Sequence, residues 1–387
     1  MSIELAYLFI TPYTLQKSRT GGVIARLLSR TDLDLVGAKI VAPTQEFADA
    51  YADYILKLED CSSSEVLQLL SDYVKENFGP HDGKYQRIMM LLFKGENARK
   101  KLQEIVGVLK SGIRTGETIR DTYSEYVLNR DGSVKYFEPA VIMSPTEGNA
   151  DKDELKFISQ YLKTEPNIIE KPLLTHNNDP SKRTLVIIKP DNWRHPSTRP
   201  GNIIDMLSKT GLRMVGCKLY RMSIEDALEF YGPVQGVLRE KLSPRIGKQA
   251  AEILHRELKL DLDDNDVLAL TNSIGIKFAD DQFSQIVEFM SGSRPEKCKS
   301  DEKSLPGRSK CLVLIYQGED AVNKIRDVLG PTDPSKAPGG TIRRDFGTDV
   351  MVNTAHASDS FDNAKREMRI IKIAKNSICD VIDDYVK

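Results

Sequence analysis

A single histidine late in the sequence sits among residues that can hydrogen-bond to it. The segment NTAHASDS spans residues 353–360 and contains His356, and Glu367 follows it. A neutral imidazole can accept a phosphoryl group on one nitrogen while the other nitrogen keeps its proton and is anchored by a carboxylate. These residue types predict a nucleophilic histidine at the end of an apolar strand, with Glu367 orienting its ring.

Upstream of this histidine lie residues that could hold a triphosphate against it. A transferring phosphoryl group spreads its charge over its oxygens, so fixed cations and hydrogen-bond donors supply most of the catalysis. The sequence contains neither GxxxxGK[ST] nor a GxGxxG after a strand, which excludes the P-loop and dinucleotide-binding classes. We therefore predict phosphoryl transfer through His356. The suitable upstream residues are Lys189, Arg326, Thr332 and Arg343.

The elements that must position these residues occur twice. AYLFITP at residues 6–12 matches TLVIIKP at 184–190, and GVIARLLSRTDLDLVGAKI at 22–40 matches GNIIDMLSKTGLRMVGCKL at 201–219. Self-similarity of this kind is the sequence signature of a duplication. We predict two tandem copies: residues 1–165, a proline-containing linker at 166–182, and residues 183–387.

Hydrophobic periodicity predicts the fold of each copy. In the second copy we expect, after the first strand and helix, strands at 212–222, 310–317 and 350–355 and helices at 224–231, 281–291, 319–329 and from 361 onward. This βαββαβ order is typical of a ferredoxin-like α+β sandwich, in which helices cover one face of a four-stranded antiparallel sheet. The two copies should pack together as a pseudo-dimer within one chain.

Two insertions are expected in the second copy. Residues 232–280 have helical patterning, and residues 293–309 form a charged loop; the first copy has a helical stretch at 63–78. The acidic run at 261–266 lacks the glycine and glutamate of an EF-hand and is better explained as a helix start with acidic residues in its first turn. A role as a lid or as a surface elaboration remains open for both insertions.

Composition excludes several classes of protein. The 387 residues carry 55 basic and 56 acidic side chains, so no global field predicts a nucleic-acid or membrane partner. Five scattered cysteines argue against a disulfide framework or a zinc site. Without a signal peptide or an apolar run of ~20 residues, we expect a cytoplasmic protein.

Three blocks in the second copy together resemble nucleoside diphosphate kinases. These blocks are IIKPDNW at 187–193, LGPTDPSKAPGGTIRRDFG at 329–347 and VNTAHASDSFDNAKRE at 352–367. The resemblance implies that His356 carries the phosphoryl group, that Glu367 and Ser358 orient it, and that Lys189 and Asn353 contact the ribose 3′-hydroxyl. It also implies a base contact at Val350. The implied phosphate-binding residues are Lys189, Tyr231, Arg326, Thr332 and Arg343.

The same resemblance implies the substrates and the cofactor. We expect ping-pong transfer between a nucleoside triphosphate, such as ATP or GTP, and a nucleoside diphosphate, with Mg²⁺ carried by the nucleotide phosphates and no direct protein ligand. Family members associate through their sheets, so further homo-oligomerisation stays open.

The sequence departs from the family pattern at several places. Ala357 stands where the family has glycine, and Arg344 is an extra cation. The aromatic residue that stacks on the base is displaced by the insertion, which leaves Gln282 in its place with Phe283 adjacent. In the first copy Thr11 replaces Lys189 and Met143 falls where His356 is, whereas Arg120 matches Arg343. We expect this copy to be inactive.

Two other functions remain open from the sequence. One is a nucleotide-binding or scaffolding protein without turnover, and the other is a histidine phosphocarrier that donates to a protein. The remaining histidines lack comparable surroundings and are interpreted as ordinary surface or loop residues; they are His81, His176, His195 and His255.

Overall fold

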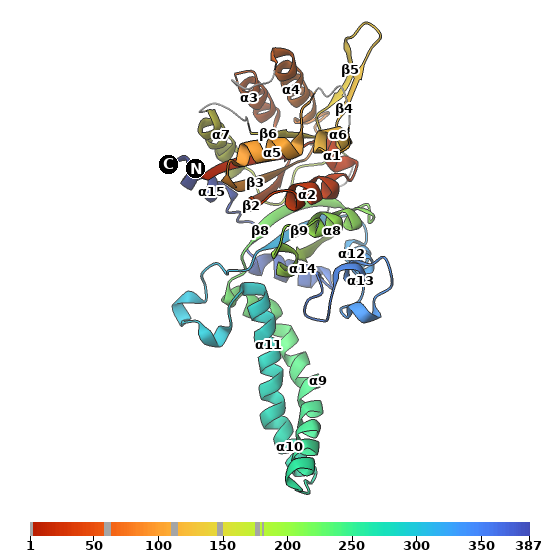
Figure 1. Ribbon diagram of the computed structural model, residues 1–387, viewed down its shortest axis with the longest axis vertical. Helices are drawn as coiled ribbons and strands as arrows, with labels where there is room; N and C mark the ends of the chain where they lie inside the picture. The colour runs from red at the N-terminus through yellow and green to blue at the C-terminus, as the bar shows by residue number, and fades with distance from the viewer. Residues whose placement is uncertain (1–2, 58–62, 110–114, 145–149, 175–178, 180–181) are drawn as a thin grey trace. The chain divides into compact units, whose positions relative to one another are not determined.

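The computed structural model describes residues 3–57, 63–109, 115–144, 150–174, 179 and 182–387 (Figure 1). The chain divides into two compact units. The first combines residues 1–219 with residues 312–387, and the second consists of residues 220–311. Six positions of the expected linker between 175 and 181, His176 among them, lie outside the described residues.

The first unit contains two four-stranded sheets that have the same strand order. The N-terminal sheet runs β2-β3-β1-β6 and the other runs β8-β9-β7-β10 when read from its β8 edge. In both, the first strand of the half lies between the third and the fourth, as in a ferredoxin-like α+β fold. The strands are β1 (Ile3–Ile10), β2 (Asp34–Val41), β3 (Ile88–Glu96), β6 (Val141–Met143), β7 (Arg183–Ile188), β8 (Arg213–Tyr220), β9 (Cys311–Gln317) and β10 (Ala355–Ala357).

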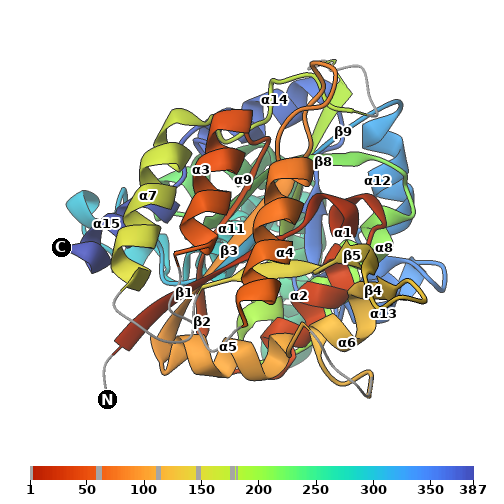
Figure 2. The same cartoon turned by 90° about the horizontal axis from the view of Figure 1, so that it is seen from above.

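Helices cover both faces of the N-terminal sheet, which corrects the expectation of a single covered face. Alternate residues Leu5, Tyr7 and Phe9 of β1 belong to a core that includes side chains of α3, α4 and α7, and α5 also contacts β1 (Figure 2). The unbroken apolar run of β1 explains this, because a strand buried on both faces needs no alternation. The helices of this half are α1 (Pro12–Gln16), α2 (Thr20–Ser29), α3 (Gln45–Ile55), α4 (Ser64–Asn77), α5 (Ala98–Val106), α6 (Ile119–Tyr123) and α7 (Ala150–Thr164).

A small β-hairpin precedes β6. It consists of β4 (Glu125–Leu128) and β5 (Val134–Glu138), which pair antiparallel. The predicted helical stretch at 63–78 is confirmed as α4, whose last turn is followed by the buried Phe78.

The helices of the second half surround the buried strand β7. Helices α12 and α14 both contact it. The elements are the 3-10 helix η2 (Pro190–Trp193), α8 (Arg199–Ser208), α12 (Ala321–Leu329), η6 (Pro334–Lys336), α13 (Ile342–Phe346) and α14 (Phe361–Ile370). The predicted start of the closing helix is confirmed, because the Ser360 hydroxyl accepts the N–H of Asn363 and caps α14.

The last strand differs from the prediction. We expected a strand at 350–355, but residues 350–352 and 354 form bends and β10 begins at Ala355. The carboxylate of Asp349 accepts the N–H groups of Met351 and Val352 at 2.7 and 2.8 Å, so these donors are not available to a sheet. His356 consequently lies inside the strand, opposite Ile187 of β7.

The two halves of the first unit pack closely. Helices α2 and α8 contact each other, and a Cβ on Gly21 would lie 2.4 Å from the Gly201 carbonyl oxygen. The C-terminal helix α15 (Ile378–Val386), which the sequence did not predict, packs on α7 and β2 of the first half. Only glycines allow the α2–α8 backbones to approach this closely.

The second unit is a helical hairpin. Its helix α9 (Ile224–Leu258) continues through Pro233 and Pro244, so the predicted helix at 224–231 and the predicted insertion at 232–280 are joined without a break. Asp263 caps the next helix with a capping box, as the acidic run predicted. The other elements are α10 (Asp264–Leu270), the π-helical turn η3 (Thr271–Gly275), α11 (Ile276–Ser291), η4 (Pro295–Lys297) and η5 (Ser300–Glu302). Among the described residues, no helix is both long and apolar enough to cross a membrane.

Candidate active site

His356 is held by the two residues predicted to orient it. Its Nε2 lies 3.0 Å from Oε2 of Glu367, and the Ser358 hydroxyl donates to the same Oε2 at 2.6 Å. Glu367 lies on α14 and is 4% exposed, whereas the His356 side chain is 22% exposed. A carboxylate accepts hydrogen bonds, so Nε2 carries the proton and the lone pair belongs to Nδ1.

The departure at Ala357 does not disturb this arrangement. Ala357 lies in β10 opposite Val186 and does not have a positive φ. A glycine is therefore not required beside His356 by the backbone conformation of this chain.

Lys189 and Asn353 form a second connected pair. The Lys189 ammonium donates to Asn353 Oδ1 at 2.6 Å and to the Met351 carbonyl at 3.4 Å. Burial lowers the pKa of Lys189 to about 8, and the positive charge of Arg343 contributes in the same direction. An ammonium with a lowered pKa gains more than an exposed one from a bound anion, since the anion favours its charged form.

The amide of Asn353 ties three loops together. Its Nδ2 donates to the carbonyls of Thr332 at 3.1 Å and Val350 at 2.8 Å, while its oxygen accepts from Lys189. The strand end at Lys189, the long Pro/Gly loop and the segment before β10 therefore meet at one buried side chain. The Thr332 side chain itself is exposed, as a residue that binds a ligand from the surface must be.

Arg343 lies beside β10 on α13. Its Nη1 donates to the Gly330 carbonyl at 2.9 Å and its Nη2 donates to the Ala355 carbonyl at 3.1 Å. Ala355 immediately precedes His356, so this guanidinium is fixed next to the nucleophile. A guanidinium has five N–H donors, so an arginine at this position can meet an anion as well as backbone carbonyls.

Arg326 is exposed on the last turn of α12. Its charge helps to lower the pKa of Asp359, for which the hydrogen bond from Asn363 is the larger cause. Because Asp359 follows Ser358 in the sequence, Arg326 lies near the end of the histidine segment.

Two further residues were predicted to contact the nucleotide, Val350 and Tyr231. Val350 is 58% exposed, as a residue that lines one side of a base could be. Tyr231 lies in α9 of the second unit and is buried, with its ring 4.9 Å from that of Phe230. Phe283, beside the displaced stacking position, is also buried in the second unit.

Three functional neighbours were missed by the sequence. Buried Asp191 pairs with Arg199 at 3.3 Å, and Arg199 also approaches the hydroxyl of Thr354 at 3.4 Å. Thr354 has a φ of 75°, which is strained for a β-branched residue, and its carbonyl accepts the N–H of Lys189 at 2.9 Å. The aspartate of the IKPD motif was the sequence signal that could have identified Asp191. No sequence pattern predicts the strained backbone at Thr354.

Burial raises the pKa of Asp191, while Arg199 and Lys189 oppose that shift. The positive charges of Arg199 and Lys189 therefore favour the charged carboxylate of Asp191, which the buried position alone would disfavour.

The corresponding place in the first half has the opposite electrostatic character. Thr11 donates its hydroxyl to buried Glu138 at 2.8 Å, and Tyr73 donates to the other oxygen of Glu138 at 2.6 Å. Burial raises the pKa of Glu138, with the hydrogen bond from Tyr73 acting against it. A carboxylate thus lies beside Thr11, which occupies in the first half the position that Lys189 occupies in the second.

The predicted position of Met143 is wrong by one residue. Ile142 pairs with Phe9 of β1, just as His356 pairs with Ile187 of β7, while Met143 pairs with Leu8. The prediction assumed connections of equal length between the last strand and the following helix. The residue at the histidine place is still one that cannot accept a phosphoryl group.

Within the described ranges, no group of three or more His, Cys, Asp or Glu side chains could hold a metal ion. Glu367 already holds His356, and Asp191 pairs with Arg199. The donors around the histidine are cations and hydroxyls, which suit phosphate oxygens.

Fold and site together define an α+β protein with a carboxylate-anchored histidine among fixed cations. The family model "Nucleoside diphosphate kinase" matches residues 296–375. A nucleoside diphosphate kinase of Helicobacter pylori (strain P12) is 30% identical over 187 residues, covering 48% of this chain and 92% of that protein. One of Erythrobacter litoralis (strain HTCC2594) is 31% identical over 186 residues, covering 48% and 89%. The chain belongs to the nucleoside diphosphate kinase family.

Solved structures of the family are also similar to it. The nucleoside diphosphate kinase of Aquifex aeolicus is 26% identical and covers 49% of this chain and 94% of its own, with a TM-score of 0.30. The enzyme of Pyrobaculum aerophilum, also 26% identical, covers the same shares with a TM-score of 0.32.

Proposed function

We propose that this protein is a nucleoside diphosphate kinase that transfers the γ-phosphate of a nucleoside triphosphate to a nucleoside diphosphate through phospho-His356. The observation that carries the proposal is the 3.0 Å contact between His356 Nε2 and Glu367 Oε2. A histidine that is buried only as a core residue needs no carboxylate aligned with one ring nitrogen.

The chemistry proceeds in two balanced steps. In the first, the lone pair of Nδ1 attacks the γ-phosphorus, an N–P bond forms, and the bond to the β–γ bridging oxygen breaks as the diphosphate leaves. The imidazole gains positive charge, which Glu367 stabilises through Nε2–H. In the second, a terminal oxygen of another diphosphate attacks the phosphorus and the N–P bond breaks, which regenerates neutral His356.

The surrounding residues hold the phosphates during both steps. Arg343 is fixed beside Ala355, Arg326 lies near the end of the histidine segment, and exposed Thr332 offers a hydroxyl from the Pro/Gly loop. Lys189 and Asn353 present an ammonium and an amide to the ribose 3′-hydroxyl and the neighbouring phosphate. Val350 would contact the base. We keep Tyr231 as a phosphate ligand on the family resemblance alone.

The substrate would be the magnesium complex of the nucleotide. The ion neutralises charge on the phosphate oxygens when it is bound. The residues of this chain contribute cations and hydroxyls to the same oxygens, while the carboxylates of Glu367 and Asp191 are engaged with His356 and Arg199.

We further propose that residues 1–165 are a second, inactive copy joined to the catalytic copy by the linker at 166–182. The common strand order supports this, as does the match of Gly107 and Gly330, which both end a helix at φ 82°. The carboxylate of Glu138 beside Thr11 would repel a triphosphate. The contact of α2 with α8 gives this pair of copies the character of an intrachain dimer.

The proposal is tested by incubation with γ-³²P-labelled ATP. The wild-type protein should acquire an acid-labile, base-stable label and pass it to GDP, and His356→Ala should acquire none. Label on His356→Ala, or no label on the wild type, contradicts the proposal. Binding without any label would identify a scaffolding protein. Labelled His356 that does not discharge to any nucleoside diphosphate would identify a phosphocarrier.

A further inference from the structure

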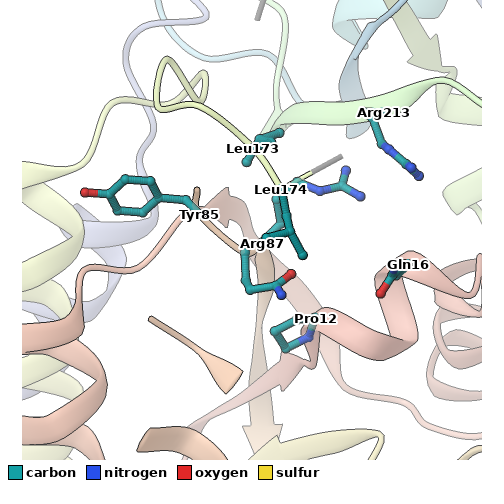
Figure 3. A pocket seen from close by; sticks show the side chains of 8 residues that line it. Pro12, Gln16, Tyr85, Arg87, Leu173, Leu174 and Arg213 are labelled. Atoms are coloured by element: carbon teal, nitrogen blue, oxygen red, sulfur yellow. The ribbon is translucent and has the colours of Figure 1, made fainter. Parts of the chain in front are cut away.

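A second cluster of positive charge lies away from the histidine site, at the junction of the two halves of the first unit. Arg87 immediately precedes β3 in the first half, and Arg213 is the first residue of β8 in the second half. Both line a small pocket with Gln16 of α1 (Figure 3). The other walls include Pro12 and the pair Leu173 and Leu174.

Among the described residues, no protein carboxylate forms an ion pair with either arginine. In the part of the chain that the structure describes, the one hydrogen bond of their side chains runs from Arg87 Nη1 to the Met214 carbonyl at 2.6 Å. The Nε of Arg213 is buried without a hydrogen-bond partner among these residues. A buried N–H of a charged group without a partner costs free energy that a ligand oxygen would restore.

The charges of the two guanidinium groups also act on each other. Burial lowers the pKa of Arg87 to about 10, and the positive charge of Arg213 contributes to the shift. Two like charges in a partly apolar pocket repel, and that repulsion weakens when an anion lies between them.

The pocket is small, with a volume of about 20 Å³. A single water needs roughly 10–15 Å³ by this measure, so the enclosed part holds one or two groups of that size. A nucleoside is too large for it, whereas one end of a tetrahedral oxyanion fits. Planar guanidinium forks match the oxygen spacing of phosphate and sulfate.

We propose that Arg87 and Arg213 form a binding site for a small tetrahedral oxyanion, of which inorganic phosphate is the physiological example. The bound anion accepts N–H groups from a residue of each half, and Gln16, which lines the same pocket, offers an amide as a third donor group. Because the two arginines belong to different halves, the anion fastens the halves together. The site is separate from the histidine site and does not depend on the proposed reaction.

Thermal unfolding in chloride, phosphate and sulfate at equal ionic strength tests the site. Since the histidine site could also take phosphate, the parent protein carries Arg326→Gln. Phosphate and sulfate at about ten times the dissociation constant should raise the Tm of this parent by about 2 °C relative to chloride. Adding Arg213→Gln should abolish the rise. Adding Arg245→Gln, which removes the same charge from an exposed position on α9, should preserve it.

The variants also predict a change in the absence of the oxyanion. In chloride, Arg213→Gln should leave the Tm equal to or above that of the parent, because it removes the repulsion with Arg87. If Arg213→Gln does not fold, Arg87→Met replaces it and should abolish the phosphate effect in the same way. No rise in the parent, or an equal rise in the parent and the Arg213→Gln protein, overturns the proposal.

In the otherwise unchanged protein, Arg213→Gln should leave kinase activity as it is. A loss of activity together with a retained phosphate effect would also contradict the site, since it would place Arg213 in the reaction.

Discussion

Arg343 and Arg120 make the same pair of backbone hydrogen bonds in the two halves of the chain. Arg343 donates to Gly330 and to Ala355, and Arg120 donates to the carbonyls of Gly107 at 2.8 Å and Val141 at 3.3 Å. In each half the guanidinium ties the glycine that ends a helix to the first residue of the last strand. Ile142 occupies the place of His356 in the first half, yet Arg120 makes the same contacts there, so Arg343 has a structural role in addition to the phosphate contact proposed for it.

The pair allows the structural and catalytic contributions of this arginine to be separated. Arg120→Gln should lower the free energy of unfolding by ~2 kcal/mol, because two buried carbonyls lose their donors. Arg343→Gln should cost about as much and should also reduce kcat per folded molecule. Urea denaturation and steady-state kinetics measure the two effects. Equal kcat values for both variants would mean that Arg343 has no catalytic part.

The single oxygen of Glu367 that serves both His356 and Ser358 predicts a graded series of defects. Glu367→Gln should slow phosphorylation of His356 by roughly 10–100-fold, the range found when a partner that fixes a functional imidazole is altered. Ser358→Ala removes one hydrogen bond, worth ~1 kcal/mol, and should slow it by about fivefold. Rapid quench in a single turnover measures these rates directly. A Ser358→Ala defect larger than that of Glu367→Gln would contradict the assigned roles.

The sequence predicted the contacts that depend on residue type and missed those that depend on backbone path. The His356 and Glu367 contact followed from local chemistry and from a helix start that Ser360 marks. The extent of β10 was wrong because Asp349 captures the donors of Met351 and Val352. That competition is a matter of local geometry, which the apolar pattern at 350–355 does not reveal.

The hydrophobic pattern of the sequence also failed to predict long-range packing. The one-residue error at Met143 arose because pairing register depends on the length of a connection whose residues carry no periodic signal. The burial of both faces of β1 could have been read from its unbroken apolar run. The packing of α15 on the first half could not have been predicted, because an amphipathic pattern shows that one face of a helix is buried but not which surface that face packs against.

The lowered pKa of Lys189 predicts an alkaline limit to activity. The ammonium is charged below its pKa of about 8 and loses its proton above that value, so kcat/KM should fall as the pH rises through about 8. In Lys189→Arg this decrease in kcat/KM, the alkaline limb of the pH profile, should be absent up to pH 10, because a guanidinium stays protonated. Profiles of kcat/KM between pH 6.5 and 10 measure this. An unchanged limb in the Arg variant would assign it to another group.

The ion pair of buried Asp191 with Arg199 makes a further prediction about the same limb. The carboxylate of Asp191 favours the charged form of Lys189, as does that of Asp349 to a smaller extent. Asp191→Asn removes the negative charge and keeps a side chain that can meet Arg199, so the pKa of Lys189 should fall below about 8 and the alkaline limb should move to lower pH. Asp349→Asn is the matched control and should move it in the same direction by less. Each pKa unit corresponds to ~1.4 kcal/mol. A pH profile of modest precision resolves a shift of half a unit in the alkaline limb. A limb that stays in place in Asp191→Asn, or that moves to higher pH, would show that Asp191 does not set the charge of Lys189.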